Sequence, residues 1–364
     1  MKASVNPSFW KGKKVFLTGH TGFKGSWLSL WLQQMGARVK GFSLEPPTTP
    51  ALFDVANVSQ GMENEIGDIR DREHILKSMH DFNPEIVIHM AAQPLVRLSY
   101  VEPVETYSTN VMGTVHVLEA ARQCSNLKAI VNVTTDKCYE NKEWEWGYRE
   151  NESMGGFDPY SNSKGCVELV TSAYRQSFFS TKGSAQLASA RAGNVIGGGD
   201  WADDRLIPDI LRAFQNQKPV IVRNPLATRP WQHVLEPLSG YLVLAESLYK
   251  NYEDSSTDNV AEGWNFGPKD DDAKSVEWIL NTMVEQWGNG ASWSLDTNPQ
   301  PHEAKFLKLD ISKVHSRLHW QPTWRLEQTL ARIVNWHQAW LGNIDMKEEC
   351  LRELDDYMTD MKKN

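Results

Sequence analysis

The sequence has few cysteines and no long apolar run. Its four cysteines are scattered and include no CxxC pair, which argues against both a zinc knuckle and a disulfide framework. No apolar stretch reaches the roughly 18–20 residues that a membrane span needs. The N-terminus also lacks the apolar region of a signal peptide. We therefore expect a cytoplasmic protein without a membrane partner and without a metal site.

Concentrated positive charge is also missing. The 46 acidic residues outnumber the 38 basic ones, the net charge is −8, and no block of lysine and arginine stands out. A nucleic-acid partner is therefore not expected, because binding to a phosphate backbone needs clustered cations. The chain has 364 residues, of which 40% are hydrophobic and 23% charged, and this composition fits a globular protein of two lobes.

The first half of the chain contains a regular alternation of apolar strands and helices. The expected strands are 14–18, 37–44, 85–90, 129–133 and 185–190, and the expected helices are 26–35, 74–81, 104–124 and 160–178. This alternation predicts an α/β fold with a doubly wound, Rossmann-type parallel sheet.

The rhythm of the sequence changes near residue 195, where a glycine-rich loop is followed by an expected helix over 206–215 and a short strand over 219–222. We therefore expect a first domain over 1–195 and a smaller mixed α/β domain over 196–364. A segment of about 229–266 is expected to return to the first domain.

Three glycines spaced GxxGxxG follow the first expected strand and precede the first helix, in KKVFLTGHTGFKGSW. Such glycines permit a tight turn, the approach of a pyrophosphate to the backbone, and close packing of helix on strand. This context makes a dinucleotide site much more probable than a simple turn. The predicted cofactor contacts here are Gly19, Thr21, Gly22, Phe23, Lys24 and Gly25. For Lys24, a pyrophosphate contact and a solvated loop lysine are equally good interpretations.

The end of the second strand decides between NAD and NADP. An acidic residue is expected there to hold the adenosine ribose, but the sequence has Ser43, with Glu45 two residues later. Ser43 can still hydrogen-bond a hydroxyl, and no arginine follows it to take a 2′-phosphate. We therefore predict NAD. Further predicted cofactor contacts are Asp68, Ile69, Ala91 and Ala92.

Tyr160 and Lys164 are four residues apart at the start of an expected helix, so they share one face. A free phenol is a poor base at neutral pH, with a pKa near ~10, but a neighbouring cation favours the phenolate. Such a tyrosine could accept a proton from a sugar hydroxyl. The strand 129–133 ends nearby in sequence in two hydroxyls, an acid and an ammonium, TTDK.

TGHTGFKG, VTTDKCY and YSNSK, in this order, resemble the extended short-chain dehydrogenase/reductase family over nearly the whole chain. Within it, TGHTGFKGSW, GFSLEPPT, TTDKCYEN and RPWQHVLEP look most like the CDP-glucose 4,6-dehydratase branch of the nucleotide-sugar 4,6-dehydratases. The resemblance implies a hydro-lyase that converts CDP-D-glucose to CDP-4-dehydro-6-deoxy-D-glucose and water. Such a reaction supplies the biosynthesis of 3,6-dideoxyhexoses for lipopolysaccharide.

The resemblance also implies roles for individual residues. Thr135 helps Tyr160 to orient the O4 atom of the sugar, and Tyr160 and Lys164 contact the cofactor. Asp136 matches the acid that protonates the departing C6 hydroxyl. Lys137 departs from many relatives, which carry a glutamate as the C5 base. It is a base only in a dry, closed site; otherwise it holds Asp136, binds substrate or forms a structural ion pair.

The same resemblance assigns the nucleotide sugar to Gln93, Asn194 and Arg229. Family members commonly pair through two long helices, here 104–124 and 160–178, so a homodimer or homotetramer is expected. The loop 140–156 is either a lid over the site or a plain surface loop. The alternatives are another nucleotide-sugar 4,6-dehydratase, a 4-epimerase of the same fold, which Asp136 disfavours, and a dinucleotide sensor without catalysis.

Overall fold

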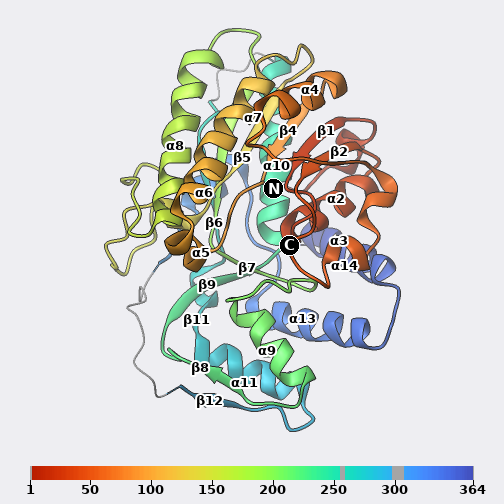
Figure 1. Ribbon diagram of the computed structural model, residues 1–364, viewed down its shortest axis with the longest axis vertical. Helices are drawn as coiled ribbons and strands as arrows, with labels where there is room; N and C mark the ends of the chain where they lie inside the picture. The colour runs from red at the N-terminus through yellow and green to blue at the C-terminus, as the bar shows by residue number, and fades with distance from the viewer. Residues whose placement is uncertain (1, 255–258, 297–306, 364) are drawn as a thin grey trace.

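A seven-stranded parallel sheet organises the computed structural model, which describes residues 2–254, 259–296 and 307–363 (Figure 1). Across the sheet the strands are β10 (Gly263–Phe266), β6 (Gln186–Ala192), β5 (Ala129–Val133), β4 (Ile86–His89), β1 (Lys14–Thr18), β2 (Arg38–Ser43) and β3 (Glu63–Ile66). The chain runs outward from β1 to β3, then returns to β4 on the other side of β1. This is the doubly wound order that the sequence predicts, and it places a topological switch point between β1 and β4.

Alternate side chains of the strands feed two separate cores. Val15 and Leu17 of β1 point into a core with α2 (Phe23–Gln34) and α10 (Leu235–Asp254). Phe16, between them, points into the opposite core. Helices α4 (Arg72–Phe82), α7 (Gly113–Ala121) and α8 (Pro159–Phe178) cover that second face. Because helices bury both faces, the strands read as continuous apolar runs in the sequence.

The expected helix over 104–124 is a continuous helical segment with a π-helical turn inside it. It comprises α6 (Pro103–Tyr107), the π turn η2 (Ser108–Met112) and α7. The start of α8 is set by Asp158, whose carboxylate accepts a hydrogen bond from the Ser161 N–H at 2.9 Å, and by Pro159 in the first turn.

A second lobe lies below the sheet in the view of Figure 1. It contains a three-stranded sheet in the order β11 (Ala273–Ser275), β9 (Thr228–His233), β7 (Asn194–Ile196), and the pair β12 (Trp293–Leu295) and β8 (Val220–Val222). Helices α9 (Leu206–Gln215), α11 (Val276–Trp287) and α13 (Leu326–Leu341) complete its apolar core. Within the segment 229–266, α10 and β10 join the first lobe, whereas β9 belongs to the second.

The C-terminal end of the chain departs from the expected division into 1–195 and 196–364. Helices α12 (Ser312–Leu318) and α14 (Met346–Lys363) bury their apolar sides in the core of the first lobe. Tyr357 of α14 packs edge-on against Trp31 of α2, with ring centroids 5.6 Å apart. The C-terminal helix therefore supports the helix that follows the glycine motif, a long-range contact that no local pattern indicates.

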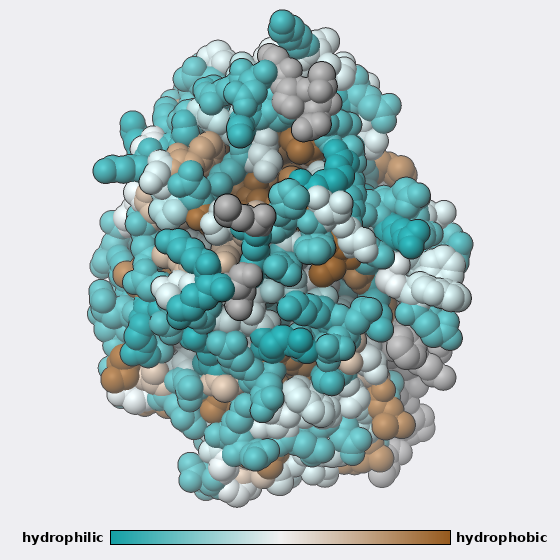
Figure 2. Space-filling view, turned by 180° about the vertical axis from the view of Figure 1, so that it is seen from behind, coloured by the Kyte–Doolittle hydropathy of each residue, from teal (hydrophilic) through white to brown (hydrophobic). Residues whose placement is uncertain are grey.

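Short elements connect these layers. They are α1 (Pro7–Trp10), α3 (Leu52–Val55), η1 (Val58–Gly61), α5 (Val96–Val101), η3 (Asp136–Cys138) and η4 (Asp270–Asp272). Sequence reasoning missed β3, because this edge strand reads ENEI and lacks an apolar run. In the described part of the chain, no helix is long and apolar enough to cross a membrane. The face shown in Figure 2 is mostly hydrophilic, with small scattered hydrophobic groups.

Candidate active site

The glycine turn (residues 19–25) joins β1 to α2 and can be built only with glycine at two positions. Gly19 has φ +78°, and a Cβ there would lie 2.8 Å from the Ala91 nitrogen. A Cβ at Gly25 would lie 2.0 Å from the Gly19 oxygen. The turn therefore presses the first strand, the first helix and the end of β4 together, at the carboxyl edge of the sheet.

The start of α2 is open toward a ligand. Gly22 precedes the helix in extended conformation, and no side chain caps the N-terminus. The first N–H groups of the helix lack helical partners and point outward, which suits a phosphate. This cradle, which a Cβ would fill, fits the pyrophosphate of a dinucleotide.

Around this turn, the residues predicted to hold the adenosine half are fixed by their neighbours. The Ser43 hydroxyl lies 2.9 Å from the Thr21 hydroxyl. Asp68 pairs with Arg70, whose hydrogen bonds outweigh the effect of burial and lower the pKa of Asp68. Ile69 is buried with its side chain against Gly113. Ala91 and Ala92 follow β4. Their contacts with a cofactor stay predictions.

Lys24 is not the solvated loop lysine of one interpretation. Its Nζ donates to the Tyr241 Oη of α10 at 2.9 Å and lies 4.9 Å from the centre of the Tyr241 ring. Burial, helped by the charges of Lys164 and Arg205 and opposed by that of Asp136, lowers the pKa of Lys24 to about 7. Sequence reasoning missed Tyr241 and Arg205, since neither lies in a recognisable motif.

The catalytic turn (residues 135–139) follows β5 and brings a hydroxyl, an acid and a phenol together. The Thr135 Oγ1 donates to the Asp136 Oδ1 at 2.9 Å, and the Thr135 side chain also interacts with the Tyr160 phenol of α8. Asp136 is only 1% exposed. The structure thus brings Tyr160 close to Thr135 and Asp136, although Tyr160 follows Thr135 by 25 positions in the sequence.

The expected cationic activation of Tyr160 stays a prediction, because burial shifts the pKa values of both Tyr160 and Lys164 against it. Burial raises the pKa of Tyr160 well above its ordinary value; the nearby Thr135 side chain opposes this, and the charge of Asp136 adds to it. Burial also lowers the pKa of Lys164 to about 8, although Glu168 opposes that shift. The reason is general: loss of water disfavours phenolate and ammonium alike.

Lys137 lies beside Asp136 without being buried. Its Nζ is 3.7 Å from the Asp136 Oδ1, and its side chain is 34% exposed. A lysine acts as a base only when burial or a cation lowers its pKa. This geometry favours the interpretation in which Lys137 holds Asp136.

A buried ion pair beneath the catalytic turn was missed. Arg191 of β6 donates from Nε and Nη2 to the two carboxylate oxygens of Glu168 at 2.9 and 2.8 Å. Ser189 also donates to Glu168, at 2.7 Å, and Arg191 Nη1 donates to the Tyr139 hydroxyl at 2.6 Å. Glu168 lies one helical turn after Lys164, and this spacing is the signal that could have revealed it.

The predicted substrate residues lie in two places. The Gln93 amide is engaged within its own turn: its Oε1 accepts from the Leu95 N–H, and its Nε2 donates to Thr106 at 2.8 Å. It therefore shapes the chain after β4 rather than presenting a free amide. Asn194 on β7 and Arg229 on β9 lie on adjacent strands of the second lobe.

The loop 140–156 is neither a free lid nor a plain surface loop. Its Tyr148 exchanges backbone hydrogen bonds with Lys308 and Asp310, each 2.9 Å long. The Tyr148 ring stacks on Tyr139 with centroids 5.2 Å apart, and Trp144 stacks on its other side. The loop is therefore fastened at its centre to both the catalytic turn and the C-terminal segment.

Comparisons with known proteins agree with this arrangement. A family model described as GDP-mannose 4,6 dehydratase matches residues 16–333. The CDP-glucose 4,6-dehydratase of Salmonella typhimurium is 61% identical over 359 residues, which cover 98% of this chain and 99% of the relative. The dTDP-D-glucose 4,6-dehydratase of Homo sapiens is 23% identical over 347 residues, 93% of this chain and 94% of the relative.

Solved structures are similar in fold. A UDP-glucose 4-epimerase from Thermotoga maritima, determined with UDP-glucose, has a TM-score of 0.77 at 20% identity and covers 90% of this chain and 99% of its own. A dTDP-glucose 4,6-dehydratase from Bacillus anthracis, in complex with NAD, has a TM-score of 0.71 at 20% identity over 90% and 97%. At this identity the likeness supports the two-lobed fold.

Proposed function

The chain belongs to the GDP-mannose 4,6-dehydratase family, within the extended short-chain dehydrogenases/reductases, and from this premise we propose that it is an NAD-dependent CDP-glucose 4,6-dehydratase. The reaction converts CDP-D-glucose to CDP-4-dehydro-6-deoxy-D-glucose and water, as a hydro-lyase. The proposal rests on the contacts of Thr135 with both Asp136 and Tyr160. They bring a carboxylic acid and a phenol together at the carboxyl ends of the strands. The 61% identity over nearly the full length supports the choice of CDP-glucose.

The glycine turn and the α2 N-terminus would hold the pyrophosphate of NAD, and Ser43 and Asp68 are proposed to bind its adenosine half. When bound, NAD accepts a hydride from the sugar and later returns it within the same turnover. The remaining steps are acid–base steps, which fall to side chains of this chain.

Tyr160 accepts the proton of the O4 hydroxyl, with Thr135 orienting both groups. The buried phenol must first become a phenolate, and nearby positive charge favours that form. In the proposed complex the charge comes from Lys164 and from the oxidised cofactor ring.

Elimination of water removes the C5 proton, which the new 4-keto group acidifies, and the C5–H electron pair forms the C5–C6 double bond. Asp136 donates a proton to the C6 hydroxyl as the C6–O bond breaks, because hydroxide is a poor leaving group. Its burial keeps the carboxyl away from bulk water, and the Lys137 ammonium 3.7 Å away holds its position. Asn194 and Arg229 are proposed to bind the diphosphate, for which the planar guanidinium fork of arginine is suited.

Product analysis tests the proposal. The purified protein is incubated with NAD and a panel of CDP-, dTDP-, UDP- and GDP-activated hexoses, and the products are identified by mass and NMR. We expect a 4-keto-6-deoxy product from CDP-glucose. The variant Asp136→Asn, which keeps the size of the side chain but removes the acid, is expected to lose dehydration. Formation of CDP-galactose instead would mean an epimerase, and no turnover of any sugar would favour a sensor.

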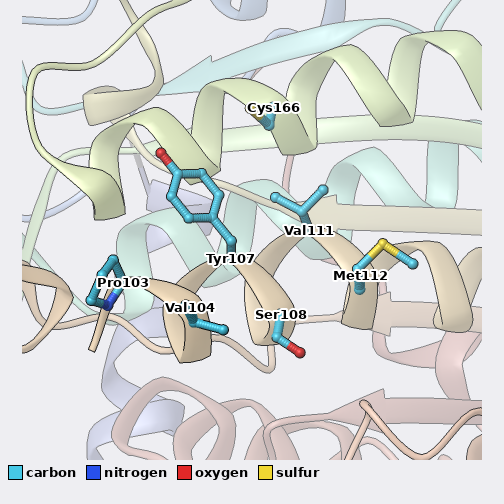
Figure 3. A pocket seen from close by; sticks show the side chains of 7 residues that line it. All are labelled: Pro103, Val104, Tyr107, Ser108, Val111, Met112 and Cys166. Carbon is cyan, nitrogen blue, oxygen red and sulfur yellow. The ribbon is translucent and has the colours of Figure 1, made fainter.

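Self-association is a further part of the proposal. An apolar depression between α6, η2 and α8 is lined by Pro103, Val104, Tyr107, Ser108, Val111, Met112 and Cys166 (Figure 3). Val104 on α6 is 80% exposed and Leu169 on α8 is 62% exposed. Burying such side chains between two copies is favourable, so we expect a homodimer or a homotetramer. Light scattering of wild type and Val104→Glu tests this expectation.

A cytoplasmic location also stays a prediction.

A further inference from the structure

Lys24 leaves the glycine turn in an unusual direction. It lies in the first turn of α2, but its ammonium reaches the Tyr241 hydroxyl of α10 at 2.9 Å. Tyr241 is itself 0% exposed and interacts electrostatically with Tyr160 and Asp136. The Lys24 side chain therefore runs from the pyrophosphate cradle toward the reaction centre.

We propose that Lys24 tunes the cofactor: its ammonium lies against the nicotinamide half of bound NAD and favours the reduced, uncharged ring over the oxidised, cationic ring. This inference rests on the proposed function, because it requires NAD to bind at the glycine turn. It assigns Lys24 neither to the pyrophosphate nor to the sugar.

The position follows from the two ends of the site. The pyrophosphate must lie at the glycine turn, and the ring that exchanges a hydride must lie beside Tyr160. The charged groups that interact with Lys24 are Lys164 on α8, Arg205 before α9 and Asp136 in the catalytic turn. Lys164 and Asp136 belong to the candidate active site, so the ammonium is oriented toward that end of the cofactor.

The sign of the effect follows from Coulomb's law. A cation close to the nicotinamide destabilises NAD, whose ring is positive, and leaves NADH unaffected. The first oxidation of the sugar becomes more favourable, and the return of hydride becomes less so. Burial and two neighbouring cations lower the pKa of Lys24 to about 7, so the effect is strong below neutral pH and fades above it.

The test is a titration of the purified protein with NAD and with NADH at pH 6 and at pH 9. Tryptophan fluorescence reports the binding. At pH 6, Lys24→Met is expected to lower the ratio of the NAD Kd to the NADH Kd by roughly tenfold, the scale of two charges several ångströms apart in a partly screened site. At pH 9 the two proteins should differ little. Lys24→Arg, which keeps the charge at both pH values, should keep the ratio high at both.

Lys11→Met removes an exposed lysine from the same end of the chain and should behave as wild type. If Lys24→Met fails to fold, Lys24→Gln repeats the test with a polar group left for Tyr241. Equal weakening of NAD and NADH would overturn the inference, because it would assign Lys24 to the pyrophosphate; an unchanged ratio would overturn it as well. Wild-type protein that binds neither cofactor would instead remove the proposed function, on which this inference rests.

Discussion

The glycine turn and the catalytic turn lie at the same edge of one sheet but are held in different ways. In the glycine turn, the backbone leaves no room for a Cβ at Gly19 or Gly25, so sterics choose the residue. In the catalytic turn, Thr135 donates to Asp136, and the buried Glu168–Arg191 pair is hydrogen-bonded to the flanking residues Thr134 and Tyr139. The first region depends on local geometry, whereas the second depends on partners that are distant in sequence.

The largest effect is expected from breaking the catalytic turn at its phenol. Tyr160→Phe removes the proposed base without changing the shape of α8, so we expect kcat to fall by about 10²–10⁴. NAD binding should be retained, because the glycine turn is intact. Steady-state kinetics measures kcat, and a cofactor titration measures NAD binding. Loss of both turnover and NAD binding would show that the glycine turn and the catalytic turn are not independent.

Breaking the ion pair beneath the catalytic turn should cost stability. Glu168→Gln leaves the Arg191 guanidinium buried without its charged partner, which we expect to lower the free energy of unfolding by about 3–5 kcal/mol. Glu119→Gln is the matched control, because it breaks the more exposed pair with Arg122 and should cost less than about 1 kcal/mol. Urea unfolding measures both changes, and equal costs would contradict the larger stabilising effect expected of the buried pair.

Breaking the glycine turn should cost cofactor affinity more than stability. In Gly25→Ala the new methyl group collides with the Gly19 carbonyl, so α2 must move away from β1. We expect a destabilisation of about 1–3 kcal/mol and a marked loss of NAD binding. Gly342→Ala is the control for stability: Gly342 has φ −77°, and its Cβ would lie in ordinary contact, 3.4 Å from the nearest atoms. Unchanged NAD affinity in Gly25→Ala would argue against the cradle.

The smallest effect is expected on the pH dependence of stability, through Lys164 of α8. The pKa of Lys164 is about 8 in the folded chain, against 10.5 for an ordinary lysine, so between these values the folded state binds fewer protons than the unfolded state. By linkage, this group makes the stability rise with pH over that window. Lys164→Met is therefore expected to be more stable than wild type at pH 7, by about 1–3 kcal/mol, and to lose that advantage by pH 10.5. Urea midpoints of wild type and Lys164→Met across this pH range test the prediction. A difference between the two proteins that does not change with pH would contradict the lowered pKa of Lys164.

The C-terminal helix shows the same contrast on a larger scale. Its amphipathic pattern predicts a helix but not a neighbour. In the structure, α14 packs on α2. From α14, the Tyr357 hydroxyl also donates to the buried carboxylate of Glu236 on α10, at 2.7 Å. The expected domain division therefore fails at this end of the chain.

The sequence alone determined five strands of the sheet (β1, β2, β4, β5 and β6), the glycine turn and the shared face of Tyr160 and Lys164. These depend on neighbours a few residues away, whose spacing and size are written in the chain. The tertiary structure decided the direction of the Tyr160 and Lys164 pKa shifts, the Glu168–Arg191 pair and the contact of Lys24 with Tyr241. Each of these depends on burial and on charges brought together from distant segments, and no local pattern carries that information.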